Sequence, residues 1–337
     1  KDTISSSAYV DAAVHGDGLT ALQYRQADGA DTEEKRLVQR FPDAVRLERR
    51  GKRFIFSAAR KGTPFSDPVS VDLDLGEEVF TGLFICSHNE DIRESALFSN
   101  LRITVPAEPD FTPYEDYIGS RMEIIDIKTG IRRIILESSK PLEAPNWTDR
   151  AAEIMYNSEG LLYLFNMETG HTRQIFTDFA VNNNNDHVIS PDGKTIGLSN
   201  DDPEFSEGYN SRIYTVPAGG GAPVLVTEKS PSYLHGWSPG GRFLIYTADR
   251  GGNYDIYRIS AQGGDEERLT EAAGLDDGSE YSPDGTFIYF NSSRTGTMQI
   301  WRMRADGSSK EQLTFDTYND WFPHPSPNGK LIAFLSY

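Results

Sequence analysis

Short hydrophobic runs and alternating runs follow one another along most of this chain, with turn-forming residues between them. Residues 243–246 and 287–290 are apolar runs, and residues 255–259 and 299–303 alternate between apolar and polar positions. Alternation with a period of two is typical of a half-buried strand, and a short apolar run between turns is typical of a buried one. The pattern therefore predicts an all-β protein built from many short strands.

A four-residue turn recurs at a nearly constant spacing. Copies of a Ser-Pro-Asp-Gly-like sequence begin at Ser190, Ser238, Ser282 and Ser326, and a degenerate copy stands at residues 147–149. Proline presets φ at the second position, Asp or Asn tolerates a left-handed conformation at the third, and Gly supplies positive φ at the fourth. Four strands in each period of about 40–45 residues are typical of one blade of a β-propeller.

The two ends of the repeated region each hold half a blade. Residues 122–137 have the pattern of the third and fourth strands only, and residues 321–337 that of the first and second strands only. Pairing of such halves would remove two open sheet edges and close a ring of five blades. If the chain continues past Tyr337, a sixth blade would fit.

The front of the chain lacks the repeat but alternates well. Strands are expected near residues 9–12, 45–49 and 54–57, and further strands at the segments 72–76, 79–88 and 98–103. We therefore predict three parts: a β-sandwich of the jelly-roll kind over residues 1–105, incomplete at its start, a proline-rich linker over 106–116 and the propeller over 117–337. Prolines stiffen such a linker and keep it out of a central strand.

The repeats resemble those of TolB-type propellers, because Ser-Pro-Asp-Gly turns are combined with Ile-Tyr on the third strand and Leu-Thr on the fourth. That family is commonly six-bladed and includes protein-binding, peptidase-associated and carbohydrate-active members, so the resemblance implies a fold and not one function. The order of the front strands is similar to the last strands of concanavalin-like or laminin-G-like jelly rolls of secreted bacterial proteins. The two resemblances imply a periplasmic or extracellular protein.

Composition excludes several classes of partner and several structural features. The formal charge of −18 disfavours nucleic acid and anionic membranes as partners. No apolar run is long enough to span a bilayer, so no membrane span is expected. A single cysteine, Cys86, excludes an internal disulfide framework, and its apolar neighbours predict that it is buried.

Polar residues just upstream of the repeated turns are the candidate site. The strand that enters this turn is the innermost strand of a propeller blade, so its side chains begin near the central channel. The candidate ligand-binding residues on this channel rim are His187, His235, Glu280, His324, Asp186 and Asp277. Strict alternation would send His187 and His235 to one side and Glu280 and His324 to the other. Packing between blades is the alternative role for each histidine.

Converging imidazole and carboxylate groups can bind a divalent cation or transfer protons. His187, His235 and His324 are therefore candidate ligands of a manganese, calcium or zinc ion, and the polar run 182–186 is a weaker candidate for calcium. Fold and channel histidines together are similar to propeller lyases that cleave oligogalacturonate with manganese. That resemblance implies an arginine for the uronate carboxylate, and Arg212 and Arg250 are candidates.

Two functions stay open. The first is an exported binding protein that recognises a glycan or a protein through the channel mouth and the sandwich face. The second is a metal-dependent carbohydrate-active enzyme. Tryptophans can stack on sugar rings, but packing between blades is the expectation for Trp237 and Trp301. The polar clusters at residues 15–18 and 87–89 could line a sugar-binding face of the front domain, although turn chemistry explains the first equally well.

Overall fold

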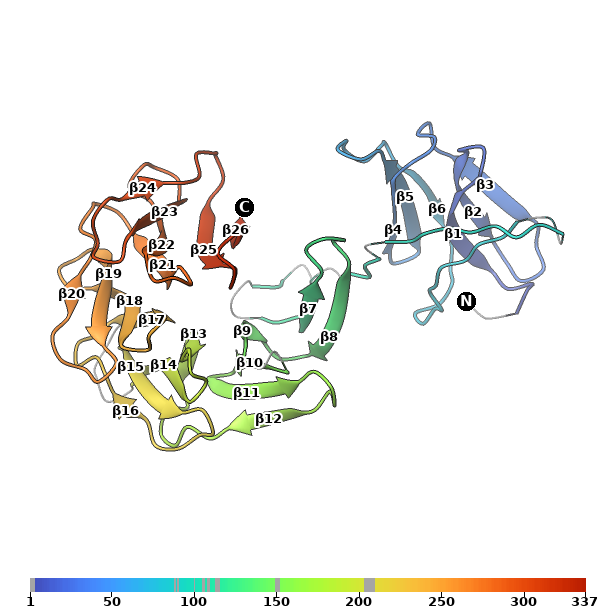
Figure 1. Cartoon of the computed structure of the whole chain (residues 1–337). Coiled ribbons are helices and arrows are strands. Elements are labelled where there is room, and N and C mark those ends of the chain that lie inside the picture. The colour runs from blue at the N-terminus through green and yellow to red at the C-terminus, as the bar shows by residue number, and fades with distance from the viewer. Residues whose placement is uncertain are drawn as a thin grey trace. The chain divides into compact units, whose positions relative to one another are not determined.

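The computed structural model describes residues 4–87, 89, 91–99, 101–104, 107, 110–112, 116–148, 152–202 and 210–337. Every regular element in these ranges is a β-strand, so the all-β prediction is confirmed (Figure 1). Over the same residues, no helix is long and apolar enough to cross a membrane. The chain divides into two compact units, Lys1–Phe98 and Ser99–Tyr337. The predicted limits at residues 105 and 116 stay predictions.

In the described part of the first unit, the strands form two antiparallel sheets of three strands each. One sheet has the order β1-β2-β3 and the other the order β4-β5-β6. Their bounds are β1 (Tyr9–Val14), β2 (Thr20–Arg25), β3 (Thr32–Arg36), β4 (Ala44–Arg50), β5 (Arg53–Ala59) and β6 (Val69–Asp72). The alternating patterns at residues 9–12, 45–49 and 54–57 therefore do mark strands.

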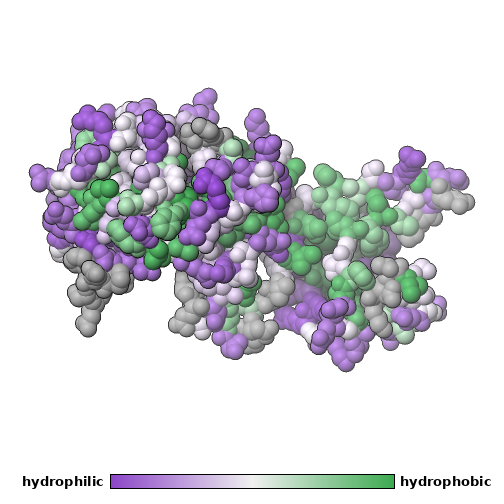
Figure 2. All heavy atoms as spheres, turned by 90° about the horizontal axis from the view of Figure 1, so that it is seen from below, coloured by the Kyte–Doolittle hydropathy of each residue, from purple (hydrophilic) through white to green (hydrophobic). Residues whose placement is uncertain are grey.

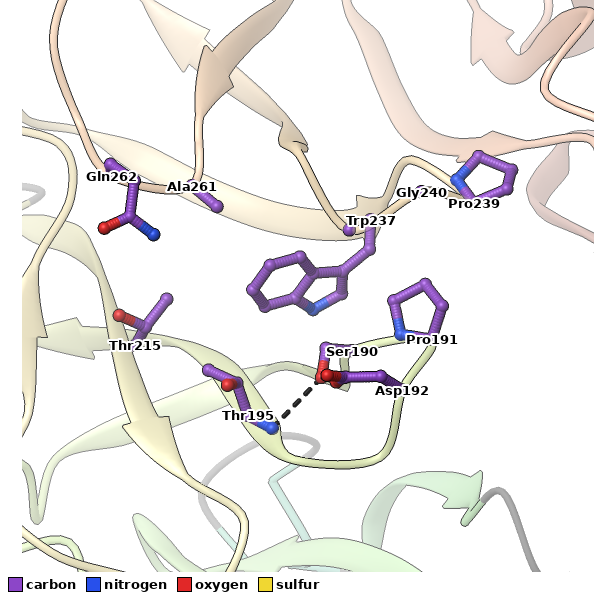
Figure 3. Close-up of a pocket in the computed structure, with 11 residues that line it drawn as sticks. Ser190, Pro191, Asp192, Thr195, Thr215, Trp237, Pro239, Gly240, Ala261 and Gln262 are labelled. Atoms are coloured by element: carbon purple, nitrogen blue, oxygen red, sulfur yellow. Dashed lines mark hydrogen bonds between the residues drawn. The ribbon is translucent and has the colours of Figure 1, made fainter.

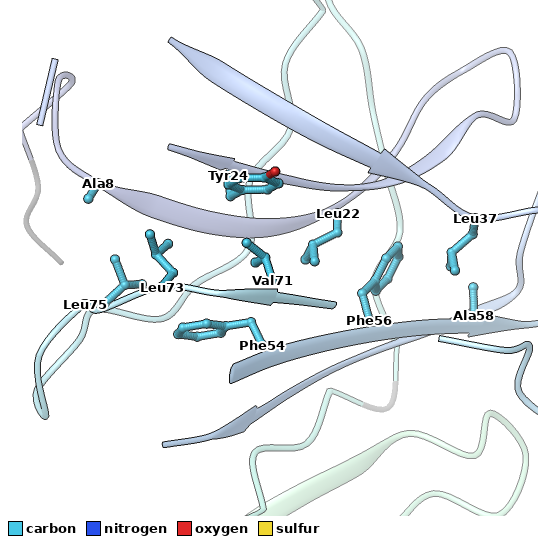
Figure 4. Packing of buried hydrophobic residues seen from close by; sticks show 10 residues of the cluster. All are labelled: Ala8, Leu22, Tyr24, Leu37, Phe54, Phe56, Ala58, Val71, Leu73 and Leu75. Carbon is cyan, nitrogen blue, oxygen red and sulfur yellow. The ribbon is translucent and has the colours of Figure 1, made fainter. Parts of the chain in front are cut away.

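One hydrophobic core lies between the two sheets (Figure 4). Leu22 and Tyr24 of β2 face Phe54 and Phe56 of β5 across it, and Val71 of β6 lies beside them. Phe56 is fully buried, and burial of a side chain of this size stabilises the fold by about 2–3 kcal/mol. The unit is thus a small β-sandwich, while its jelly-roll topology stays a prediction.

The strands expected at residues 79–88 and 98–103 are not formed in the described parts of those segments. Alternation alone does not make a strand, because the backbone also needs a neighbouring strand as its hydrogen-bond partner. Apolar side chains reach the surface in several places (green in Figure 2), and Phe80, Phe84 and Leu97 are among the exposed ones. Cys86 is exposed as well, so the prediction of a buried thiol was wrong.

Several predictions fall outside the described residues. His88 of the polar cluster at 87–89 is one, and so are all three prolines of the predicted linker, Pro106, Pro109 and Pro113. Residue 149 of the degenerate turn is another.

The described residues of the second unit form four antiparallel sheets of four strands, and each of these sheets is one blade. In each, the four strands follow one another in chain order. The blades are β9 (Glu143–Trp147), β10 (Glu153–Ser158), β11 (Leu161–Asn166) and β12 (Thr172–Ile175); β13 (Asn183–Ile189), β14 (Thr195–Asp201), β15 (Ser211–Pro217) and β16 (Val224–Leu225); β17 (Ser232–Trp237), β18 (Phe243–Asp249), β19 (Tyr254–Ser260) and β20 (Glu267–Arg268); and β21 (Asp276–Tyr281), β22 (Phe287–Ser292), β23 (Gln299–Arg304) and β24 (Glu311–Gln312).

Two hairpins stand at the ends of this arc of blades (Figure 1). They are β7 (Ser120–Ile125) with β8 (Arg132–Ser138), and β25 (Asp320–Pro325) with β26 (Ile332–Ser336). Each forms a separate two-stranded sheet, and no strand pairing joins the two hairpins among the described residues. The half-blades are therefore present, but the seam that would close five blades is not formed, and the blade number stays a prediction.

The repeated turns link the first and second strands of their blades. In each of the four copies the glycine N–H donates to the carbonyl of the first serine at 2.8 Å, and the glycine φ lies between 67° and 71°. Positive φ is the reason why glycine stands at this position. The spacing of the turns thus identified the blades correctly.

Each innermost strand also has an irregular register with the second strand of its blade. The ladder shifts between Asn183 and His187 in β13, between Leu234 and Gly236 in β17, and between Asp277 and Glu280 in β21. The same happens in the first blade and in the terminal hairpin β25–β26. Such bulges re-aim side chains, and they lie on the strands that carry the predicted site.

Candidate functional site

Two histidine–carboxylate pairs connect the innermost strands of neighbouring blades. The Nε2 atom of His235 in β17 lies 2.7 Å from the Oδ1 atom of Asp277 in β21. One blade further, the Nδ1 atom of His324 in β25 lies 2.7 Å from the Oε2 atom of Glu280 in β21. The innermost strands line the concave side of the arc in Figure 1, so both pairs belong to this side.

The His235–Asp277 pair is largely buried and ionised at neutral pH. Burial disfavours the charged imidazolium, but the neighbouring Asp277 carboxylate outweighs burial and raises the pKa of His235 to about 8. Burial also acts against the charge of Asp277, yet the contact with His235 keeps the pKa of this carboxyl below its ordinary value. The two side chains are 12% and 18% exposed, so solvent screens this pair only weakly.

Two further carboxylates act on the same imidazole. Burial raises the pKa of Asp186 to about 6, and the charge of His235 opposes this rise. Glu280 also raises the pKa of His235, although less than Asp277 does. We call Asp186, His235, Asp277, Glu280 and His324 the inner-strand cluster, because each of them interacts with at least one other member.

The bulges explain why this cluster forms although strict alternation would have divided it. His235 is the extra residue of the β17 bulge, since Leu234 and Gly236 pair with the consecutive residues Tyr246 and Ile245. Its side chain therefore leaves the ideal alternation and reaches the next blade. Strict alternation therefore does not describe the strand at His235.

His187 lies apart from the cluster. It is 4% exposed, and burial lowers the pKa of its imidazole to about 4, so it is neutral at physiological pH. No hydrogen bond between the His187 ring and the cluster is present among the described residues. Packing between blades, the alternative role expected for each histidine, fits the buried and neutral His187.

An aromatic side chain covers the cluster on one side. The ring of Phe322 in β25 lies 6.1 Å from the ring of His235. The backbone N–H of Phe322 donates to Oδ1 of Asn291 at 3.0 Å. A Cβ atom at Gly278 would lie 2.8 Å from the Phe322 ring and would collide with Asn291. Phe322 and Asn291 were not predicted, because their role depends on the contact between two blades.

The C-terminal repeats match a known family model. The model described as a TolB beta propeller domain matches residues 230–337. The solved structure of putative TolB from Agrobacterium tumefaciens is 47% identical to the chain, covers 64% of it and is itself covered to 77%, with a TM-score of 0.61. The chain belongs to the TolB-like β-propeller family.

The curated relatives of this TolB-like propeller are much longer than the segments that match it. Atu1656 of Agrobacterium fabrum, an uncharacterized protein, is 48% identical over 163 residues, which are 48% of this chain and 54% of Atu1656. The Tol-Pal system protein TolB of Bordetella pertussis is 28% identical over 150 residues, which are 43% of this chain and 33% of that protein. The chain therefore spans about half or less of these relatives, and the matches fix its fold family.

The TolB-like propeller does not bring the three predicted metal ligands together. His235 and His324 each contact a carboxylate, and His187 is buried elsewhere. Within the described ranges no group of three or more His, Cys, Asp or Glu side chains is placed to hold a metal ion. These residues do not fit a three-histidine site, and manganese, calcium or zinc binding stays a prediction without a matching donor set.

The arginines proposed for a uronate substrate are engaged in ion pairs. Arg250 contacts both carboxylate oxygens of Glu266 at 2.7–3.3 Å. Burial acts to raise the pKa of Glu266, but the contacts with Arg250 and Lys229 outweigh it and lower this pKa to about 2. Arg212 contacts Asp202 at 2.5 Å and is nearly buried. Neither guanidinium is presented to a ligand in this conformation, so nothing in the arrangement favours the lyase alternative.

Proposed function

We propose that this TolB-like propeller is a binding module that recognises a polypeptide partner over the inner-strand cluster. The observation that carries the proposal is the ionised His235–Asp277 pair, which bridges two blades on the concave side of the arc. The exposed His324 and the partly exposed Glu280, which belong to the same cluster, offer directional hydrogen bonds to an incoming chain. Membership in the TolB-like family supports a binding role, because one relative is named as a part of the Tol-Pal system.

The charge of the cluster indicates which side chains the partner presents. Asp186, Asp277 and Glu280 are carboxylates, and His235 supplies a neighbouring cation. Carboxylates outnumber imidazoles, and the whole chain carries −18 charges. A partner segment with lysine or arginine is therefore favoured over an acidic one.

Export of the protein to the periplasm or the cell exterior is part of the same proposal. It rests on the resemblance to TolB-type proteins. Recognition of a glycan by the sandwich face, which the sequence suggested, stays a further proposal for the first unit.

Selection of peptides tests the proposal with no partner sequence assumed. The full chain is used to select binders from a displayed library of random 12-residue peptides, and affinities of the selected peptides are measured by fluorescence polarisation. We expect enrichment of lysine and arginine and about tenfold weaker binding to Glu280→Gln, which removes one half-exposed carboxylate. Asp306→Asn, a charge removal in an outer turn, is the matched control and should leave the affinity unchanged.

Two results would contradict the proposal. The first is a selection that yields no binder, or only acidic ones. The second is a set of basic peptides whose affinity is the same for wild type, Glu280→Gln and Asp306→Asn.

A further inference from the structure

A second site lies at the repeated turns, between the blade β13–β16 and the blade β17–β20. A cavity of about 470 Å³ opens there (Figure 3). The turn beginning at Ser190 forms one wall, and the turns at 238–241 and 261–262 form the other. No member of the inner-strand cluster lines this cavity, and its volume is in the range of small-ligand sites.

A fixed indole borders the cavity. Trp237 is the last residue of β17 and is 9% exposed, so it packs between blades as expected and only an edge of its indole borders the cavity. Its Nε1–H donates to the carbonyl of Val188 at 3.1 Å. Its ring also packs close to Gly197, where an added Cβ would lie 3.5 Å from the indole. The ring is thus held in one orientation before any ligand arrives, which lowers the entropic cost of binding.

Uncharged polar side chains line the cavity near the indole. Thr195, Thr215 and Gln262 point their side chains toward the cavity (Figure 3), and these side chains make no hydrogen bond with the described residues. They are therefore available to the hydroxyl groups of a ligand.

Asp192 adds one carboxylate to the cavity wall. Its Oδ1 atom accepts hydrogen bonds from Oγ of Ser190 at 2.7 Å and from the backbone N–H of Lys194 at 3.1 Å. Its Oδ2 atom lies 3.6 Å from Nζ of Lys194, and both side chains are exposed. Such an exposed ion pair is weak, so Oδ2 can accept a hydrogen bond from a ligand.

One departure from the repeat leaves additional space in this cavity. The third turn position is Gly240, whereas Asp284 and Asn328 occupy it in later blades and accept a hydrogen bond from the serine of their turn. A Cβ at Gly240 would meet no atom within 4 Å. The space that a side chain would fill is therefore available to a ligand.

A second cavity, of about 350 Å³, shows what the fold alone provides. It lies between the turns at Ser282 and Ser326, and Pro325 stands there at the repeat position of Trp237. The indole and the side-chain-free Gly240 are thus features of one turn pair and not requirements of the propeller.

We propose that the Trp237 cavity binds a neutral oligosaccharide. An indole beside hydroxyl, amide and carboxylate groups matches the apolar C–H face and the hydroxyl groups of a pyranose ring. The Asp192 carboxylate and the net charge of −18 oppose uronic acids. This binding is separate from the proposed recognition of a polypeptide by the inner-strand cluster.

Calorimetric titration of the full chain tests the proposal. The probes are maltotriose, cellotriose and tri-N-acetylchitotriose as neutral sugars, and trigalacturonate as an acidic one. We expect binding of at least one neutral trisaccharide and none of trigalacturonate. Gly240→Asp restores the residue type of other repeats and introduces a carboxylate into the cavity, so it should weaken binding about tenfold or more. Gln262→Ala should weaken it by a smaller factor.

Asn328→Asp makes a comparable change in the second cavity and is the control that should keep wild-type sugar affinity. Circular dichroism melting shows whether each variant is folded. The proposal is overturned if no neutral sugar binds, if trigalacturonate binds more tightly, or if folded Gly240→Asp binds like wild type. Peptide binding by Glu280→Gln is measured separately, so failure at one site is distinguishable from failure at the other.

Discussion

His187 and His235 stand at the same place in consecutive blades, and they differ in charge. Each is three residues before the serine of its repeated turn and lies on an innermost strand. The pKa of His187 is lowered to about 4 by burial, whereas that of His235 is raised to about 8 in spite of burial. The same repeat position therefore holds a neutral packing residue in one blade and a cation in the next.

The difference comes from the blade that follows. Asp277 stands five residues before its turn serine and contacts His235. The residue at the corresponding position after His187 is Tyr233, which has no carboxylate. Burial alone lowers the pKa of a histidine, and a carboxylate at hydrogen-bond distance reverses the direction. The repeat fixes where the imidazole stands, and the residue across the blade interface fixes its charge.

Removal of the Asp277 carboxylate should have the largest effect on the stability of the propeller. Asp277→Asn leaves His235 in a buried place without its counter-charge, and we expect a loss of about 3 kcal/mol in the free energy of unfolding. Urea denaturation followed by tryptophan fluorescence measures this loss. All four tryptophans lie in the second unit, so the signal reports on the propeller.

The exposed pair of the next blade is the control for this prediction. His324 and Glu280 are separated by the same 2.7 Å, but their side chains are 68% and 34% exposed. Solvent screening limits such a pair to below about 1 kcal/mol. Equal losses for Asp277→Asn and Glu280→Gln would show that burial does not distinguish the two pairs.

Acid should destabilise the propeller through His187. A histidine whose pKa is lowered in the fold stabilises it fully above the unfolded value of 6.5, and this contribution is lost as the pH falls toward 4. The loss amounts to about 2 kcal/mol by pH 5. Unfolding free energies of wild type and His187→Gln are compared at pH 7 and pH 5. A variant with the same pH dependence as wild type would contradict the prediction.

The sequence predicted the repeated region well, because the chemistry of its turns is local. Proline at the second position and glycine with positive φ at the fourth define each turn without help from the rest of the fold. The strands after the turns at Ser238 and Ser282 follow as expected, β18 and β22. At residues 79–88 a strand was also predicted, and none is formed over the described residues 79–87, since a strand also depends on a distant partner.

The site was only partly predictable for the same reason. The positions of His235, Asp277 and Glu280 just before the repeated turns predicted them as site residues. The pairing between them depends on bulges such as the one at His235, and the sequence shows no sign of a bulge there. Phe322 and Asn291 have no local signal either, because they act across a blade interface.

Alkaline pH should also destabilise the propeller, through His235 and by a smaller amount. A histidine whose pKa is raised in the fold stabilises it fully below the unfolded value of 6.5, and the contribution disappears as the pH rises through about 8. Between pH 6.5 and pH 9 the free energy of unfolding should fall by about 1.5 kcal/mol more in wild type than in His235→Gln. Direct titration of the imidazole by nuclear magnetic resonance gives the pKa independently. A value at or below 6.5 would mean that Asp277 does not offset burial, and that the two equivalent histidines differ only in degree.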